Sequence, residues 1–269
     1  MKPTGLRIAQ ISDLHFGRDV PAIAQTLRAE LRDAAPTLIA VCGDLTQRAR
    51  TVEFQAARAF LDQLPAPALV VPGNHDLPGW RVWSRIARPW RNWRQQMLTD
   101  ANGTVIHTGD GLVAVGVNTA RQWSLHPDWS RGRINIRQLN EISEAFDDAP
   151  RDALRVVVAH HPFLLTEPGR YRGLVGRSRL ALQHLHRRAD LLLGGHIHLA
   201  YSGVVSGLVI AQCGTAFSDR LKGEPNSYNL IEAEGDRMTV SIRRWDGDRF
   251  DTHQRTEYVR DGHEWRTYS

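Results

Sequence analysis

Five short segments of the chain each place polar side chains directly after a strand-like run. Together they offer two carboxylates, one amide and four imidazoles as metal ligands: Asp13, His15, Asp44, Asn74, His160, His196 and His198. Because the carboxyl ends of parallel strands meet at one edge of a sheet, we expect the five segments to lie together there. Oxygen and nitrogen ligands without thiolates favour Mn, Fe or Zn in a reactive centre over a structural zinc site.

The number and spacing of these ligands indicate two metal ions. Seven ligands exceed what one tetrahedral ion needs, and they suit two ions that share a bridging ligand. In an extended backbone residues i and i+2 point to the same side, so we expect both residues of the Asp13-x-His15 and His196-x-His198 pairs to reach the metals. Two ions about 3.5–4 Å apart can activate a hydroxide and hold the attacking and leaving oxygens of a phosphoryl transfer. A single such residue is more often structural, but five polar segments at five strand ends are hard to explain structurally, because none of them helps to build a core.

The elements that position these segments alternate along the first half of the chain. Apolar, β-rich runs at 6–11, 38–42 and 68–71 separate two segments with helical periodicity, 22–33 and 51–64. This order predicts consecutive βαβ units and a largely parallel sheet.

Further elements of both kinds are expected after residue 103. Helices are predicted at about 135–146, where Asn135 and Gln138 form a capping-box pattern, and near 178–188. Strands are predicted at 104–107, 112–117, 154–159, 190–193, 204–210, 227–233, 237–244 and 254–259. The last four, separated by polar turns, are expected to form an antiparallel second sheet packed on the first. We expect one domain over residues 1–269, with helices on the outer faces.

A segment rich in tryptophan and arginine, residues 77–103, interrupts this pattern. On a helical wheel three arginines gather opposite three tryptophans, and Pro89 would break a single helix through them: Arg81, Arg85, Arg88, Trp83, Trp90 and Trp93. The segment is predicted to be a lid or cap. A structural cap, a substrate-recognition lid and a membrane contact all remain open for it.

The chain resembles the calcineurin-like metallophosphoesterases, whose motifs D-x-H, G-D, G-N-H-[DE], H and G-H-x-H occur here in order between residues 13 and 198. The resemblance implies an α/β fold, a four-layer αββα sandwich of two mixed β-sheets flanked by helices. It also implies a phosphodiesterase with two divalent or trivalent transition-metal ions (Mn, Fe or Zn) and attack by a metal-bridging hydroxide.

The resemblance also assigns roles to individual residues. Asp13, His15, Asp44 and His198 would hold the first metal, and Asp44, Asn74, His160 and His196 would hold the second. His75 would be the catalytic histidine, with Asp76 orienting it. Two further residues are expected near the substrate, each with an equally open structural alternative: Arg48 and His161.

The segments 43–48, 73–76 and 160–162 resemble the class III cyclic-nucleotide phosphodiesterase branch, which implies a small phosphodiester substrate such as 3′,5′-cyclic AMP. A pyrophosphatase acting on a lipid-linked substrate is less favoured, because that branch resembles G-N-R-D where this chain has His75. A phosphomonoesterase, a nuclease and a metal-bound regulatory protein remain alternatives.

Composition narrows the class of protein further. The chain has 269 residues, 42% hydrophobic and 23% charged, with a net charge of +5, which excludes a disordered or fibrous protein. Cys42 and Cys213 are expected to be reduced core residues. Without an apolar run of about 18 residues or a signal-like start, we expect a cytoplasmic protein. The mild charge predicts no stable nucleic-acid complex and little membrane contact, and it leaves the oligomeric state open.

Overall fold

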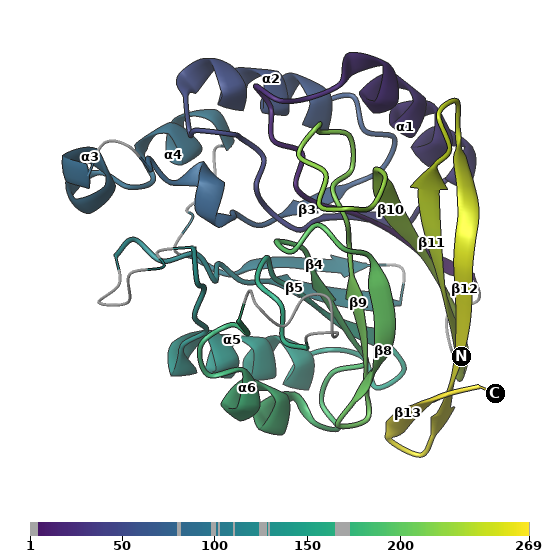
Figure 1. The fold of residues 1–269 in the computed structure, drawn as a ribbon. Coiled ribbons are helices and arrows are strands. Elements are labelled where there is room, and N and C mark those ends of the chain that lie inside the picture. The colour runs from purple at the N-terminus through teal and green to yellow at the C-terminus, as the bar shows by residue number, and fades with distance from the viewer. Residues whose placement is uncertain are drawn as a thin grey trace.

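Two mixed β-sheets form the centre of the fold, and helices cover the outer face of each (Figure 1). The computed structural model describes residues 5–79, 82–97, 101, 103–109, 111–123, 128, 130–164 and 173–268. The predicted four-layer αββα sandwich is therefore confirmed.

The first sheet combines the N-terminal strands with the C-terminal ones. Three strands run parallel, and β10 pairs antiparallel with β1 and continues the sheet on its other side. The strand order is β13 (Glu264–Thr267), β12 (Phe250–Asp261), β11 (Arg237–Trp245), β10 (Ser227–Glu234), β1 (Leu6–Ile11), β2 (Leu38–Val41) and β3 (Ala68–Val70).

The second sheet comes from the middle of the chain. Its four central strands are parallel, with one antiparallel strand at each edge. The order is β4 (Val105–Gly109), β5 (Leu112–Gly116), β6 (Leu154–Val158), β7 (Leu191–Gly194), β9 (Leu208–Gln212) and β8 (Tyr201–Val205).

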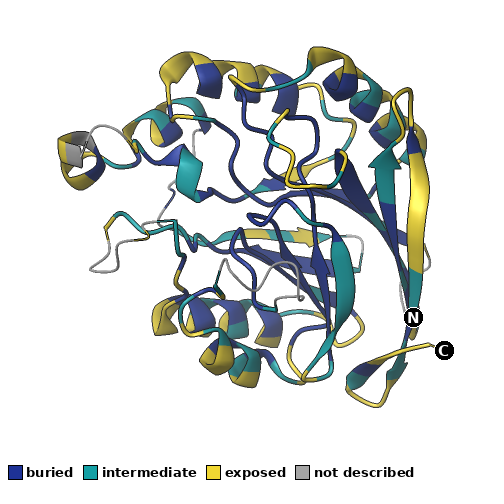
Figure 2. Cartoon of the chain, in the orientation of Figure 1, coloured by how far each residue is buried: buried dark blue, intermediate teal, exposed yellow. Residues whose placement is uncertain are grey.

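The burial of the strands explains the layers. Along β1, Ile8 packs in the cluster between the two sheets, while Ala9 and Ile11 pack against the outer helices. A third cluster joins the second sheet to its own helices. The first sheet is covered by α1 (Pro21–Ala34) and α2 (Thr51–Leu61), and the second by α5 (Ile136–Asp147) and α6 (Ser178–Leu185). Figure 2 shows the buried strands inside and the exposed outer faces of the helices.

The predicted arrangement of the C-terminal strands was wrong. Strands β10 to β13 do not form a second sheet, because the free edge of β1 accepts β10 in register from Leu6–Ala233 to Gln10–Asn229. The predicted strand at 204–210 is two strands, β8 and β9, which turn at Ser206 and Gly207. Both turn residues have positive φ, as a two-residue hairpin turn requires.

The tryptophan-rich segment forms two short helices, α3 (Val82–Ala87) and α4 (Arg91–Met97), so the predicted break at Pro89 is confirmed. Trp90 and Trp93 are buried in the cluster beside α2, where Trp93 packs edge-on against Phe54. Trp83 differs, because 85% of its surface is exposed. Arg81, one of the three arginines on the helical wheel, lies outside the described residues.

Two smaller expectations can also be compared with the structure. The capping box of α5 is confirmed, since Gln138 N–H donates to the Asn135 side chain and Asn135 N–H donates to the Gln138 side chain. Cys42 and Cys213 are buried and free of disulfides. Among the described residues, no helix is both long and apolar enough to cross a bilayer.

Candidate metal centre and active site

The seven predicted ligands lie together at the carboxyl edge of the two sheets. Each follows a strand: β1 precedes Asp13 and His15, β2 precedes Asp44, and β6 precedes His160. Asn74 begins a short 3₁₀ helix (Asn74–Asp76) after β3, and His196 and His198 follow β7. Backbone hydrogen bonds tie these loops together, for example from His15 N–H to the Asp44 carbonyl and from Gly195 N–H to the His160 carbonyl.

The backbone of the paired motifs is not extended, as the sequence argument assumed. Asp13 and His15 have φ of 54° and 47°, and His196 and His198 have φ of 78° and 61°. Asp44 shares this left-handed conformation, with φ 52°. The conformation costs non-glycine residues about 1–2 kcal/mol each, so the surrounding packing must hold it. Each pair reaches the same centre through this tightly turned backbone.

One half of the centre consists of Asp13, His15 and His198, whose donor atoms lie close together. His198 Nε2 is 3.1 Å from Asp13 Oδ1, His15 Nε2 is 3.6 Å from the same oxygen, and the two imidazole Nε2 atoms are 3.3 Å apart. All three side chains are buried.

The other half consists of Asp44, Asn74, His160 and His196. His160 Nε2 lies 3.2 Å from Asn74 Oδ1 and 3.3 Å from His196 Nδ1. Asp44 Oδ2 stands between the halves, 3.5 Å from His160 Nε2 and 3.8 Å from His15 Nε2. The structure thus brings all seven predicted ligands together around Asp44.

Hydrogen bonds on the outer nitrogen fix which ring nitrogen of His160 and of His198 faces the centre. Nδ1 of His160 lies 2.7 Å from the Cys42 carbonyl, and Nδ1 of His198 lies 2.6 Å from the Arg220 carbonyl. Carbonyls only accept, so these Nδ1 atoms donate. In the neutral rings, the lone pair of Nε2 then points inward, as a metal ligand requires.

The charges of the buried carboxylates suit cation binding. Burial would raise the pKa of Asp13, but the neighbouring His198 and His15 outweigh it and hold that pKa well below its usual range. Burial would also raise the pKa of Asp44, but the neighbouring His160 and His75 outweigh it and hold that pKa well below its usual range. Burial would lower the pKa of His160, but Asp44 and Asp13 raise it to about 9. The centre therefore presents ionised carboxylates that attract a proton or a cation.

The residues present fit a pair of metal ions. Asp13 Oδ1 is buried and accepts no hydrogen bond from the described residues, although two imidazole nitrogens face it. Lone pairs held this close repel one another unless a proton or a metal ion lies between them. Two carboxylates, an amide and four imidazoles are also the donor set that Mn, Fe and Zn accept.

Glycines leave the space that these ligands occupy. A Cβ on Gly73 would collide with Asp44 Oδ1 and the Asp44 backbone nitrogen, and one on Gly195 would collide with Ser12 Oγ. Ser12 in turn donates a hydrogen bond to Asp13 Oδ2. The glycines of these motifs therefore shape the ligand positions without being ligands.

We expect Gly73→Ala to lower metal affinity about 10- to 100-fold, because it displaces Asp44 without removing any ligand. Metal content after dialysis, measured by inductively coupled plasma mass spectrometry, checks this result. Gly109→Ala in β4 is the matched control, since a Cβ there meets nothing within 4 Å. Full metal content in Gly73→Ala would contradict the expectation.

His75 lies at the rim of the centre and contacts a residue that the sequence analysis missed. Its Nδ1 donates to the Gln47 carbonyl at 2.9 Å, and its backbone N–H donates to Asp44 Oδ1 at 2.8 Å. Arg220 Nη1 lies 2.9 Å from His75 Nε2 and 3.4 Å from His15 Nε2. Because a guanidinium only donates, His75 Nε2 accepts this bond. Arg220 follows no motif and lies 22 residues beyond His198, so its sequence position carries no signal.

Asp76 does not orient the His75 ring, contrary to expectation. Its carboxylate accepts hydrogen bonds from Gly73 N–H, Leu45 N–H, and the N–H and hydroxyl of Thr46. Burial and the nearby Asp44 raise the pKa of Asp76 to about 7. Asp76 therefore braces the two loops that carry Asp44 and Asn74, and a backbone carbonyl holds His75.

His161 is not placed to bind substrate. It is 1% exposed, its Nε2 donates to the Ser130 carbonyl at 2.7 Å, and its Nδ1 accepts from the Thr119 hydroxyl at 2.7 Å. Burial and the neighbouring His196 and His160 hold its pKa well below the usual value. The ring therefore packs behind the centre as a neutral support.

Arg48 is exposed and lines a hollow of about 400 Å³ beside the centre, together with Asn74, His75 and Arg85. Arg85 is buried, and its guanidinium donates to the carbonyls of Arg121 and Gln122. Arg85 therefore anchors a loop and does not join the arginine face of the helical wheel.

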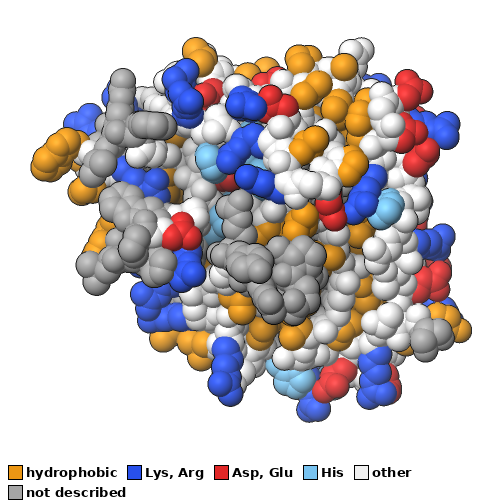
Figure 3. Space-filling view, viewed as in Figure 1, with side chains coloured by type: hydrophobic (Ala, Val, Ile, Leu, Met, Phe, Trp, Pro, Cys, Tyr) orange, Lys and Arg blue, Asp and Glu red, His pale blue; other side chains and the backbone are white. Residues whose placement is uncertain are grey.

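Histidine side chains reach the surface beside Lys and Arg side chains in Figure 3. Among the histidines outside the motifs, His107 lies in β4, and His126 lies outside the described residues.

Comparison with known proteins identifies the family. The family model for calcineurin-like phosphoesterases matches residues 6–200. A probable cyclic nucleotide phosphodiesterase of Synechococcus sp. is 24% identical over 209 residues, covering 73% of this chain and 74% of that protein. A UDP-2,3-diacylglucosamine pyrophosphatase of Chlamydia muridarum is 35% identical over 75 residues, covering 27% of this chain and 23% of that protein.

Solved structures share the fold at low sequence identity. A purple acid phosphatase from yellow lupin superposes with a TM-score of 0.68 at 12% identity, over 97% of this chain and 55% of that chain. PhoD superposes with a TM-score of 0.70 at 11% identity, over 100% of this chain and 72% of that chain. This chain thus spans about half the length of the lupin protein. It belongs to the calcineurin-like phosphoesterase family of metal-dependent phosphoester hydrolases.

Proposed function

We propose that this protein is a phosphodiesterase that uses two metal ions. The observation that carries the proposal is the position of Asp44 Oδ2 between two sets of inward-facing donor atoms. Asp13, His15 and His198 would hold one ion, and Asn74, His160 and His196 the other, with Asp44 shared. When bound, Mn, Fe or Zn ions would polarise the phosphoryl group and lower the pKa of water at the centre.

His75 and Arg220 would act on the substrate from the open side of the centre. Arg220 Nη1 donates to His75 Nε2, so an anionic phosphoryl oxygen entering here would take over that donor, because charge-assisted bonds are stronger. His75 Nε2, no longer an acceptor for Arg220, would then take up a proton from solvent and deliver it to the leaving oxygen. The Gln47 carbonyl keeps the ring in the orientation that this transfer needs.

The preferred substrate class is a phosphodiester. The match to the Synechococcus protein covers 74% of that protein. It is described as a probable cyclic nucleotide phosphodiesterase, and this supports a nucleotide diester. A phosphoanhydride is the second candidate, because the C. muridarum pyrophosphatase matches 75 residues at 35% identity. The presence of His75 and the breadth of the first match favour the diester.

Hydrolysis of bis(p-nitrophenyl) phosphate beside p-nitrophenyl phosphate tests the proposal. With Mn present we expect the diester to be cleaved faster than the monoester, and we expect a chelator to abolish both reactions. Faster cleavage of the monoester would make the protein a phosphomonoesterase. Absence of metal-dependent cleavage with both compounds would count against the phosphodiesterase assignment.

A further inference from the structure

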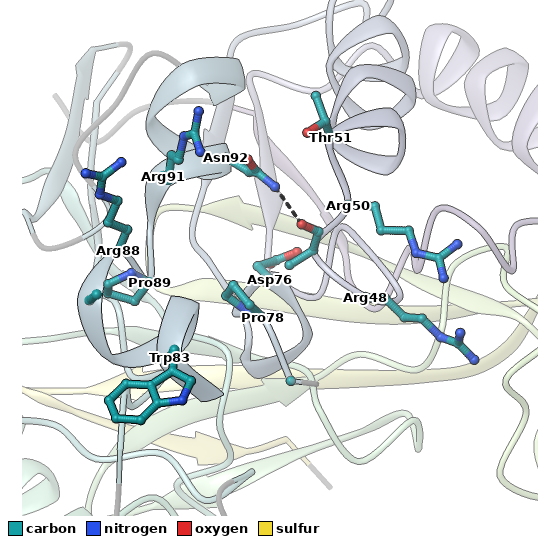
Figure 4. A pocket seen from close by; sticks show the side chains of 13 residues that line it. Arg48, Arg50, Thr51, Asp76, Pro78, Trp83, Arg88, Pro89, Arg91 and Asn92 are labelled. Atoms are coloured by element: carbon teal, nitrogen blue, oxygen red, sulfur yellow. Dashed lines mark hydrogen bonds between the residues drawn. The ribbon is translucent and has the colours of Figure 1, made fainter. Parts of the chain in front are cut away.

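A second, larger cavity of about 740 Å³ lies beside the metal centre, between the start of α2 and the helices α3 and α4 (Figure 4). Arg48 and Gly79 line both this cavity and the smaller hollow at His75. Asn92 of α4 donates a hydrogen bond to the Ala49 carbonyl at 2.8 Å, which ties the two walls together. A ligand held at the metal centre can therefore extend into this cavity, which we call the arginine pocket.

The arginine pocket is strongly positive. Arg48 and Arg50 flank it on the α2 side, and Arg88 and Arg91 flank it on the α3–α4 side (Figure 4). Within the described part of the chain, no carboxylate forms an ion pair with Arg88 or Arg91, and Glu53 is 4.0 Å from the Arg50 guanidinium. Four arginines line the cavity together with one carboxylate, so its net charge is positive and favours an anion.

The acidic side chain in the pocket wall does not offset this charge. Asp76 lines the pocket, but it is 1% exposed and both carboxylate oxygens accept hydrogen bonds from loop donors. The pocket therefore keeps its affinity for a negatively charged group.

An aromatic surface completes the pocket. Trp83 lines it from α3 and is 85% exposed, while Trp90 and Trp93 of the same segment are buried. An exposed indole costs free energy in water and offers a flat face for stacking against a base. The sequence left three roles open for this segment: a structural cap, a substrate-recognition lid and a membrane contact. The exposed Trp83 beside these arginines fits a substrate-recognition lid.

We propose that the arginine pocket binds a second phosphate group of the substrate, so that the natural substrate is a nucleotide phosphodiester bearing an additional phosphate. This inference rests on the proposed phosphodiesterase activity. A cyclic mononucleotide has one phosphate, which the metal centre would hold, and it would leave Arg88 and Arg91 without an anion. A base next to the second phosphate would meet Trp83.

Two chromogenic esters that differ by one phosphate test the inference. Thymidine 5′-(p-nitrophenyl phosphate) and its 3′-phosphorylated form release the same p-nitrophenol from the same diester bond. We expect kcat/KM to be at least about tenfold higher for the 3′-phosphorylated ester, the value of one charged hydrogen bond. A ratio near 1 would overturn the inference and leave the phosphodiesterase assignment intact.

Variants of the pocket make the test specific. In the double variant Arg88→Gln/Arg91→Gln, we expect the ratio of the two kcat/KM values to fall towards 1. Arg179→Gln on α6, in the opposite helix layer, is the matched control and should keep the wild-type ratio. An unchanged ratio in the double variant would place the preference outside this pocket and refute the assignment.

If neither ester is cleaved, the phosphodiesterase proposal itself is refuted. A binding measurement still tests whether the pocket holds a second phosphate. By isothermal titration calorimetry we expect thymidine 3′,5′-bisphosphate to bind at least about tenfold more tightly than thymidine 5′-monophosphate. The double variant should remove this difference, and equal affinities in the wild type would overturn the inference. Trp83→Ala should weaken the bisphosphate but not its abasic analogue, and equal weakening of both would exclude a base at Trp83.

Discussion

Asp44→Asn is expected to lower kcat/KM for a phosphodiester by about 1,000-fold, equivalent to about 4 kcal/mol of transition-state stabilisation. Asp44 Oδ2 faces both halves of the centre, so the variant removes the charge that the two ions would share. The fold should persist, because Asn tolerates the left-handed backbone at this position and its amide oxygen can still accept from His75 N–H.

Three measurements on purified protein check this expectation. Steady-state kinetics with added Mn gives the loss of activity, metal analysis gives the loss of bound ions, and circular dichroism melting in chelator reports the fold. Asp248→Asn, in the exposed turn between β11 and β12, is the matched control and should behave as wild type. Wild-type activity in Asp44→Asn would refute the shared-ligand role, and an unfolded variant would call for Asn74→Ala instead.

The second large effect is expected at the pair formed by His75 and Arg220. His75→Asn should lower kcat about 100- to 10,000-fold, the usual contribution of a general acid, while both ions remain bound. Metal retention is expected because the His75 ring hydrogen-bonds to Gln47 and Arg220, and its contact with Asp44 goes through the backbone. Arg220→Gln should lower kcat and also weaken inhibition by inorganic phosphate.

A double-mutant cycle separates a working pair from two independent residues. Because Arg220 Nη1 and His75 Nε2 are 2.9 Å apart, the double variant should lose less activity than the product of the single losses. Kinetics of the four proteins, with metal content measured in parallel, gives the coupling. Multiplicative losses would show that the two residues act separately, and loss of metal from His75→Asn would refute its catalytic role.

The sequence predicted those parts of the fold that depend on local pattern. The strands at 6–11, 38–42 and 154–159 and the helix capped at Asn135 follow from apolar periodicity and capping chemistry. All seven predicted ligands meet because strand ends in a parallel sheet share one edge.

Other features depend on contacts that no local pattern records. The pairing of β10 with β1 joins residues more than 200 positions apart, and the backbone of Asp13 and His15 is set by the loops around it. Arg220 reaches His75 from a loop without a motif, and Arg85 is buried by a loop that periodicity could not place. The Ser206–Gly207 turn did carry a local signal, since Ser-Gly is a common turn dipeptide.

The pairing of β1 with β10 has a consequence for the order in which the protein forms during synthesis. Asp13 is held by late parts of the chain: the Thr215 hydroxyl donates to its carbonyl, and His196 N–H donates to its carboxylate. As the chain leaves the ribosome, about 200 further residues must be synthesised before the loop that carries Asp13 can form these hydrogen bonds. Non-local contacts of this kind slow folding. A nascent chain therefore cannot assemble the proposed metal centre early, and bound metal would mark a protein whose two sheets are already joined.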